Sequence, residues 1–303
     1  MILNCHRIAG ALFLFKSAWM PQAQPRTPPD PIRHAASAVS VRRLRIALGT
    51  WLAVEASAET EADALTGIGA AYAAVSKVER LMHPSCEGSD LKRINSAQPG
   101  SVMAIHASTA QVLRFAQRLH EVSGGVFDPC LPEKPGRVSD LAFECPGAEP
   151  DEVAVAPARN CSVKCLAPVA LDLGGVAKGY AIDRAVEALR RAGCSAGLVN
   201  AGGDLRLFGA RCEIILLRRT AGKHRRLWLR DSALAVSDLD ACERPPEHRG
   251  YYFRSDAGAS SRRYAAVLAQ EAMTADALTK CVLLCPPAHL ERVLREYGGR
   301  VVA

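Results

Sequence analysis

The stretch that decides the fold runs from Leu171 to Gly209 and reads LDLGGVAKGYAIDRAVEALRRAGCSAGLVNAGGDLRLFG. Apolar residues over 169–173 predict a buried strand, which the paired glycines 174–175 interrupt. Apolar residues at helical spacing then predict a helix that Gly193 ends. A second short strand follows, and residues 200–204 (NAGGD) predict another tight turn.

This stretch has features typical of a phosphate-binding site. Glycines let the backbone approach a ligand closely, and the free N–H groups at a helix start favour an anion. Lys178 is placed where a cation would meet a phosphate. Two ordinary strand–turn–helix connections would explain the glycine pairs alone. The joint occurrence of Asp172, Lys178 and the turn at 200–204 favours the binding site, in which Asn200 and Asp204 are expected to shape the turn by hydrogen bonds to the backbone.

Three further segments carry a resemblance to a known family. Residues 123–129 (SGGVFDP) match its S-G-G-x-F-D-P turn, and residues 81–95 (LMHPSCEGSDLKRIN) are similar to its segment ending in S-E-L-x-x-L-N. Residues 273–278 (MTADAL) resemble its A-D-A-L box near the C-terminus. Together with the glycine-rich stretch, these segments occur in family order over roughly residues 43 to 300. The chain therefore resembles the ApbE family, the FAD:protein FMN transferases.

The resemblance implies an α+β fold with T-fold-like ApbE architecture, in which helices pack on mixed or antiparallel sheets. The expected strands and helices also mix without regular alternation, which favours α+β over a doubly wound α/β fold. We expect residues 1–40 to form a disordered leader or weak signal segment, and residues 41–303 to form one flavin transferase domain. Residues 130–167, rich in proline, cysteine and charge, predict a long irregular connection.

The activity implied by the resemblance is Mg²⁺-dependent transfer of FMN from FAD to a threonine hydroxyl of an acceptor flavoprotein, with release of AMP. A hard divalent cation bound by oxygen ligands suits cleavage of a diphosphate. The resemblance assigns the metal to the carbonyl of Gly175, to Asp276 and to a side chain four residues further on. It assigns contacts with FAD to Asp172, Lys178, Val126, Phe127 and Asp128. Taken alone, Phe127 would be a core residue and Asp128 a turn residue.

The sequence departs from the family pattern at the metal site. The fourth residue after Asp276 is Lys280 where the family has a threonine, and Thr279 lies one place early. Because a protonated lysine cannot ligate Mg²⁺, either Thr279 becomes the ligand, or Lys280 replaces part of the metal's charge, or metal binding is weakened. We favour Mg²⁺ retained on Asp276, with Lys280 in contact with the phosphates. Alternatively, Asp276 only complements the dipole at a helix start.

A second departure concerns activation of the acceptor. The family histidine that is thought to help activate the threonine aligns with Tyr251, and the aspartate of the same motif aligns with Arg254. His248, three residues earlier, is the remaining candidate for a general base, although a lone loop histidine is often a bystander. Loss of the family histidine supports one alternative, an FAD pyrophosphatase that gives FMN and AMP. Together with Lys280 it supports a second, a non-catalytic flavin-binding homologue.

The composition limits the partners that the chain can have. Its formal net charge of +7 suits an anionic substrate, but aromatic residues are only 5% of the chain and do not interleave the basic runs. We therefore expect FAD and an acceptor flavoprotein as partners, and no nucleic acid.

The cellular location is left open by conflicting signals. The apolar run over residues 8–15 is too short to span a bilayer and makes a weak signal segment. Eleven cysteines without a C-x-x-C pair predict buried or reduced thiols and favour the cytoplasm. The resemblance instead implies the periplasmic face of the inner membrane, with peripheral association.

Overall fold

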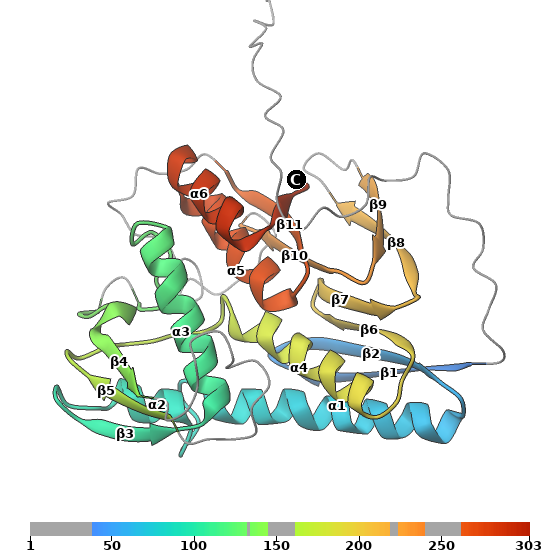
Figure 1. Ribbon diagram of the computed structural model, residues 1–303, viewed down its shortest axis with the longest axis horizontal. Coiled ribbons are helices and arrows are strands. Elements are labelled where there is room, and N and C mark those ends of the chain that lie inside the picture. Colours follow the sequence, from blue (N-terminus) through green and yellow to red (C-terminus); the bar gives the residue numbers. More distant parts are fainter. Residues whose placement is uncertain (1–37, 132–133, 145–160, 219–223, 240–261) are drawn as a thin grey trace, which may run out of the picture.

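The computed structural model describes residues 38–131, 134–144, 161–218, 224–239 and 262–303. Its centre is a seven-stranded sheet in which every neighbouring pair of strands is antiparallel (Figure 1). The strand order is β1 (Val39–Ala47), β2 (Thr50–Ala58), β6 (Ala196–Ala201), β7 (Asp204–Gly209), β10 (Ala233–Asp238), β11 (Tyr264–Ala269) and β12 (Arg300–Val301). An antiparallel sheet with packed helices confirms the predicted α+β class.

Two smaller sheets accompany the large one. The first has the order β3 (Val102–Ile105), β5 (Cys161–Cys165) and β4 (Leu141–Glu144), with the short 3₁₀ helix η1 (Val138–Asp140) leading into β4. The second is a hairpin of β8 (Cys212–Arg218) and β9 (His224–Arg230). The prediction of a wholly irregular connection over 130–167 is therefore wrong, because η1, β4 and β5 fall within it.

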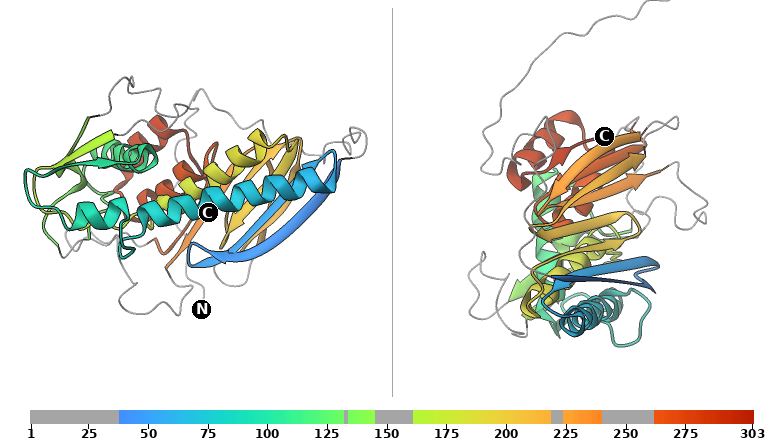
Figure 2. Two further views of the ribbon diagram at one scale, coloured as in Figure 1. Left: turned by 90° about the horizontal axis from the view of Figure 1, so that it is seen from below. Right: turned by 90° about the vertical axis from the view of Figure 1, so that its right-hand side faces the viewer.

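The helices are α1 (Glu61–Met82), α2 (Asp90–Asn95), α3 (Ala107–Val122), α4 (Ala177–Arg191), α5 (Ala272–Leu284) and α6 (Pro287–Tyr297). Helices α1 and α4 lie side by side against one face of the large sheet (Figure 2), and α5 packs on α4, β10 and β11. The buried residues of these helices and of that face form the larger of two apolar cores. On the other face, the β8–β9 hairpin covers β7, β10 and β11 with a second core made mainly of leucines.

The glycine-rich stretch folds largely as predicted. The apolar residues whose spacing predicts the helix are buried along α4, namely Ile182, Ala185, Val186 and Leu189. Gly193 follows the end of the helix with a φ of +83°, a left-handed conformation that favours glycine. Strands β6 and β7 form a hairpin whose two-residue turn is Gly202–Gly203, and both glycines have positive φ.

One element of this stretch was predicted wrongly. Residues 169–173 do not form a strand, because the only β-bridge within them joins Leu171 to Cys130. The side chain of Asn95 takes the place of a neighbouring strand. Its Nδ2 donates to the carbonyl of Leu171 at 2.9 Å, and its Oδ1 accepts from the N–H of Leu171 at 2.8 Å. A side-chain amide thus satisfies the backbone groups that a partner strand would otherwise bind.

None of the helices in the described residues is both long and apolar enough to cross a membrane. The described cysteines are free thiols at positions 86, 130, 165, 194, 212, 281 and 285, whereas Cys161 is disulfide-bonded. The expectation of buried or reduced thiols is therefore wrong for Cys161.

Candidate functional site

The glycine turn and the A-D-A-L box meet where α4 packs against α5. The N–H of Gly179 in α4 donates to Oδ2 of Asp276 in α5 over 3.1 Å. The two helices approach so closely that a Cβ atom on Gly179 would lie 2.3 Å from the carbonyl oxygen of Ala272. This position therefore requires glycine because of the close approach.

A further carboxylate, Asp183 in α4, fixes the start of α5. Oδ1 of Asp183 accepts from the N–H of Ala272 at 2.9 Å, and its Oδ2 accepts from the N–H of Met273 at 2.8 Å. Arg206 in β7 places Nη1 2.5 Å from Oδ1 of the same carboxylate. Burial raises the pKa of Asp183, and the positive charge of Arg206 opposes that rise. Asp183 thus caps α5 from a neighbouring helix and positions Asp276 within it.

Two lysine–carboxylate pairs form a charged cluster, defined here as Lys178, Asp204, Asp276 and Lys280. Lys280 is ion-paired with Oδ1 of Asp276, and its Nζ also donates to the carbonyl of Asp276 at 3.1 Å. Lys178 Nζ lies 2.7 Å from Oδ2 of Asp204. Burial raises the pKa of Asp204, and so does the negative charge of Asp276, while both lysines oppose the rise. The two pairs therefore lie within electrostatic reach of each other.

Asp204 belongs to the site in a different role from the one that the sequence predicts. Its neighbour Asn200 shapes the turn as predicted, because Asn200 Oδ1 accepts from the N–H of Gly203 at 3.0 Å. The carboxylate of Asp204 instead turns inward, where its Oδ1 accepts from the N–H of Val236 at 2.9 Å. The expectation that Asp204 hydrogen-bonds its own turn is therefore corrected. The signal available in the sequence was a carboxylate at the start of a mainly apolar strand.

Thr279 has its hydroxyl engaged within the protein. Its Oγ1 donates to the carbonyl of Asp276 at 2.7 Å, one helical turn earlier. The hydroxyl of Ser237 in β10 lies 2.7 Å from the same oxygen. Because Thr279 has a single hydroxyl hydrogen, Ser237 is the donor in the second contact. Thr279 is fully buried, and its hydroxyl ties α5 to the sheet.

Asp172 shapes the paired-glycine turn. Its Oδ1 accepts from the N–H of Gly174 at 2.7 Å, and its own N–H donates to the carbonyl of Pro129 at 2.8 Å. Gly175 follows, buried, in the turn that leads into α4. Asp172 thus joins the glycine turn to the end of the S-G-G-x-F-D-P segment.

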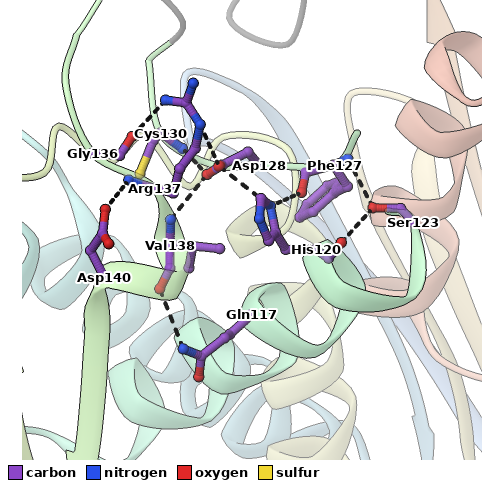
Figure 3. A network of polar contacts seen from close by, with 10 residues as sticks. All are labelled: Gln117, His120, Ser123, Phe127, Asp128, Cys130, Gly136, Arg137, Val138 and Asp140. Atoms are coloured by element: carbon purple, nitrogen blue, oxygen red, sulfur yellow. Dashed lines mark hydrogen bonds and ion pairs between the residues drawn. The ribbon is translucent and has the colours of Figure 1, made fainter. Parts of the chain in front are cut away.

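The S-G-G-x-F-D-P segment is organised by a network of polar contacts that Figure 3 shows. Asp128 is buried; its Oδ1 accepts from the N–H of Cys130 at 2.9 Å, and its Oδ2 lies 3.4 Å from Nδ1 of His120. Arg137 places Nε 3.8 Å from Oδ2. Phe127 is buried in the core, and Val126 packs partly buried against it. The contacts of these residues with FAD stay predictions.

His248, the predicted general base, lies outside the described residues, as do Tyr251 and Arg254. Within the described residues, no group of three or more His, Cys, Asp and Glu side chains is arranged to hold a metal ion. The structure thus brings Lys178, Asp276 and Lys280 together beside the start of α4, and adds Asp204 to them.

The fold is that of an α+β protein, with an antiparallel sheet and helices on one of its faces. The cluster of lysines and carboxylates lies where the glycine turn leads into α4, and it makes a candidate anion-binding site. The sequence profile described as the ApbE family matches residues 48–303. The chain therefore belongs to the ApbE family.

Solved structures share this fold. The flavin transferase ApbE from Vibrio cholerae has a TM-score of 0.68 at 18% identity, with 88% of this chain and 93% of that chain covered. The apo flavinyl transferase ApbE of Pseudomonas stutzeri gives 0.67 at 16% identity, with 87% and 90% covered. The ApbE protein of Thermotoga maritima gives 0.66 at 20% identity, with 88% and 94% covered. A comparison with curated protein sequences found no significant match.

Proposed function

We propose that this chain is an FAD:protein FMN transferase, which moves FMN from FAD to a threonine hydroxyl of an acceptor flavoprotein and releases AMP. The observation that carries the proposal is the charged cluster beside the start of α4, built from the glycine turn and the A-D-A-L box. Lys178 and Lys280 supply two ammonium groups there. Cations beside a helix N-terminus suit the diphosphate of a dinucleotide.

The proposed reaction is a displacement at the phosphorus of the FMN half of FAD. The threonine oxygen of the acceptor forms a bond to this phosphorus. The bond between the phosphorus and the bridging oxygen breaks, and its electron pair leaves with AMP. The hydroxyl proton of the threonine passes to a base or to water. Catalysis then depends on positioning the phosphates and on neutralising the charge that builds on AMP.

The residues of the site have distinct proposed roles. Lys178 and Lys280 contact the diphosphate, and Asp172 holds the glycine turn in shape. Asp276 holds Lys280 and accepts from the N–H of Gly179 in α4. Asp183 is a positioning residue, because it acts through the start of α5. No described residue is assigned as the base.

The Mg²⁺ implied by the resemblance does not fit the described side chains. Oδ1 of Asp276 is paired with the ammonium group of Lys280, which would repel a cation, and Oδ2 accepts from the N–H of Gly179. The hydroxyl of Thr279 is engaged with Asp276 and Ser237. Mg²⁺ requires an octahedral set of oxygen ligands. The proposed reaction therefore includes no step through the metal.

Transfer to water is the second candidate. The observation that favours it is Tyr251 at the position of the family histidine. Without that histidine the acceptor threonine is weakly activated, so water competes with it for the phosphorus of FAD. Such an enzyme would release FMN and AMP from FAD.

One experiment tests both candidates. The full-length protein is incubated with FAD, with and without a purified acceptor domain that carries the target threonine. Covalent flavin on the acceptor, seen as in-gel fluorescence and as a mass increase, supports transfer. AMP and free FMN without an acceptor support hydrolysis. Unchanged FAD in both samples overturns both candidates and leaves a non-catalytic flavin-binding homologue. A matched control is the acceptor with its threonine changed to alanine, which should stay unlabelled.

A further inference from the structure

The position that the resemblance gives to a metal ligand holds an ammonium group in this chain. Lys280 lies four residues after Asp276, so the two side chains share one face of α5. Nζ of Lys280 is ion-paired with Oδ1 of Asp276 and donates to its carbonyl at 3.1 Å. Lys280 thus contacts the carboxylate that a cation at this site would have to bind.

A divalent cation at Asp276 would lie beside partners that are themselves enclosed. Asp276 is fully buried, and its other carboxylate oxygen accepts from the N–H of Gly179 at 3.1 Å. The side chain of Lys280 is only 12% exposed, which limits its freedom to move aside into solvent. The ammonium is therefore confined beside the carboxylate and would repel an incoming cation.

The charge of the cluster is already balanced. Its two carboxylates, Asp204 and Asp276, face its two ammonium groups, Lys178 and Lys280. The pKa of Asp204 responds to Asp276 and to both lysines, so the four groups act on one another. In the absence of substrate, a divalent cation would therefore add uncompensated positive charge beside the two ammonium groups. Lys280 can meet the negatively charged diphosphate of FAD through a hydrogen bond donated by its ammonium group.

Lys280 also retains a donor for the substrate. An ammonium group has three N–H donors. Two of them are directed at the carbonyl and at Oδ1 of Asp276. Among the residues that the structure describes, none accepts the third, which can therefore donate to a phosphate oxygen in a strong, charge-assisted hydrogen bond.

We propose that Lys280 replaces the divalent cation in this chain, so that FAD binding and AMP release proceed without Mg²⁺. The identity of the substrate in this inference rests on the proposed function. In the reaction described above, Lys280 neutralises the negative charge that gathers on the departing phosphate of AMP. The reaction needs no additional reactant.

The test compares the full-length protein with Lys280→Thr, which restores the family residue. Each protein is stripped with EDTA and titrated with MgCl₂ by calorimetry. Wild type should give no saturable heat, whereas Lys280→Thr should bind Mg²⁺. FAD affinity, followed by flavin fluorescence, should be the same in EDTA and in Mg²⁺ for wild type. For Lys280→Thr it should fall about tenfold or more in EDTA and recover with Mg²⁺.

Two further variants make the result specific. Lys164→Thr makes the same chemical change at an exposed position of β5 and should behave as wild type. Lys280→Met removes the ammonium without adding an oxygen ligand, so Mg²⁺ should not restore its FAD affinity. Saturable Mg²⁺ binding by wild type, or loss of its FAD binding in EDTA, overturns the inference. Absence of FAD binding under every condition overturns the proposed function instead, while the Mg²⁺ titration of wild type still decides the role of Lys280.

Discussion

The backbone N–H of Gly179 and Oδ2 of Asp276 form a 3.1 Å hydrogen bond between residues that are 97 positions apart. The first N–H groups of a helix have no partner within it, and one of those in α4 is satisfied by a carboxylate of α5. The negative charge also complements the dipole of α4 at its N-terminus. This single contact therefore couples the glycine turn to the A-D-A-L box.

Gly179→Ala tests how far the site depends on this close approach. The added Cβ would lie 2.3 Å from the carbonyl oxygen of Ala272, so α4 and α5 must separate. We expect the free energy of unfolding to fall by about 1–3 kcal/mol, which outweighs the helix propensity gained by alanine. Urea unfolding followed by circular dichroism measures the change.

Gly69→Ala is the matched control, because Gly69 also lies within a helix, α1, but has no atom within 4 Å of an added Cβ. We expect it to stabilise the protein by up to about 1 kcal/mol. Equal effects of the two substitutions would show that the contact between α4 and α5 tolerates a methyl group.

Asp172 is predicted to act by shaping the glycine turn, since its Oδ1 accepts from the N–H of Gly174 at 2.7 Å. Asp172→Asn retains an acceptor oxygen and should keep the FAD affinity within about threefold of wild type. Asp172→Ala loses the acceptor and should weaken FAD binding by about tenfold, the usual cost of one hydrogen bond. Fluorescence titration with FAD gives both values. If Asp172→Asn weakened FAD binding as much as Asp172→Ala, FAD binding would depend on the negative charge of Asp172 and not on its hydrogen bond to Gly174.

Much of the fold could be predicted from local patterns in the sequence. The stripe of Ile182 and Leu189, with Gly193 after it, predicted α4 because helix period and termination are local properties. The strand expected over 169–173 failed for a tertiary reason. Asn95, far away in the sequence, hydrogen-bonds both backbone groups of Leu171, and no local pattern reveals such a partner.

The candidate site was predicted in part. Family motifs predict Lys178 and Asp276 as site residues, and the structure places both in one cluster. Asp204 was assigned a wrong role and Asp183 was missed, because their roles depend on partners on other elements, Lys178 for the first and Arg206 for the second. An aspartate beside a glycine turn is typical of an ordinary turn residue. Only the tertiary structure distinguishes an inward carboxylate from a solvated one.

Asp183 caps α5 through two backbone N–H groups, and its removal should loosen the helix that carries Asp276. Asp183→Asn has only one acceptor oxygen, so it cannot accept both hydrogen bonds. It also removes the main counter-charge of Arg206, whose side chain is largely buried. We expect a loss of about 3 kcal/mol in urea unfolding.

The control for Asp183 is Asp231→Asn, which breaks an exposed pair with Arg190. Its cost should stay below about 1 kcal/mol. A similar small cost for Asp183→Asn would contradict the capping role.

The pH dependence of stability should report on Asp204. Burial, and then the charge of Asp276, raises its pKa above the ordinary value of 3.8. The folded protein therefore holds this proton at pH values where the unfolded chain has lost it. It follows that the contribution of Asp204 to stability falls as the pH rises from near 3.8 through the folded pKa.

Asp204→Asn removes that titration while it retains an acceptor for the N–H of Val236. The free energy of unfolding of wild type minus that of the variant should therefore be largest at low pH and decrease as the pH rises. Urea unfolding of both proteins at pH values between about 4 and 8 measures this difference. A difference that grows with rising pH would mean that the ion pair with Lys178 outweighs burial, so that the pKa of Asp204 is lowered.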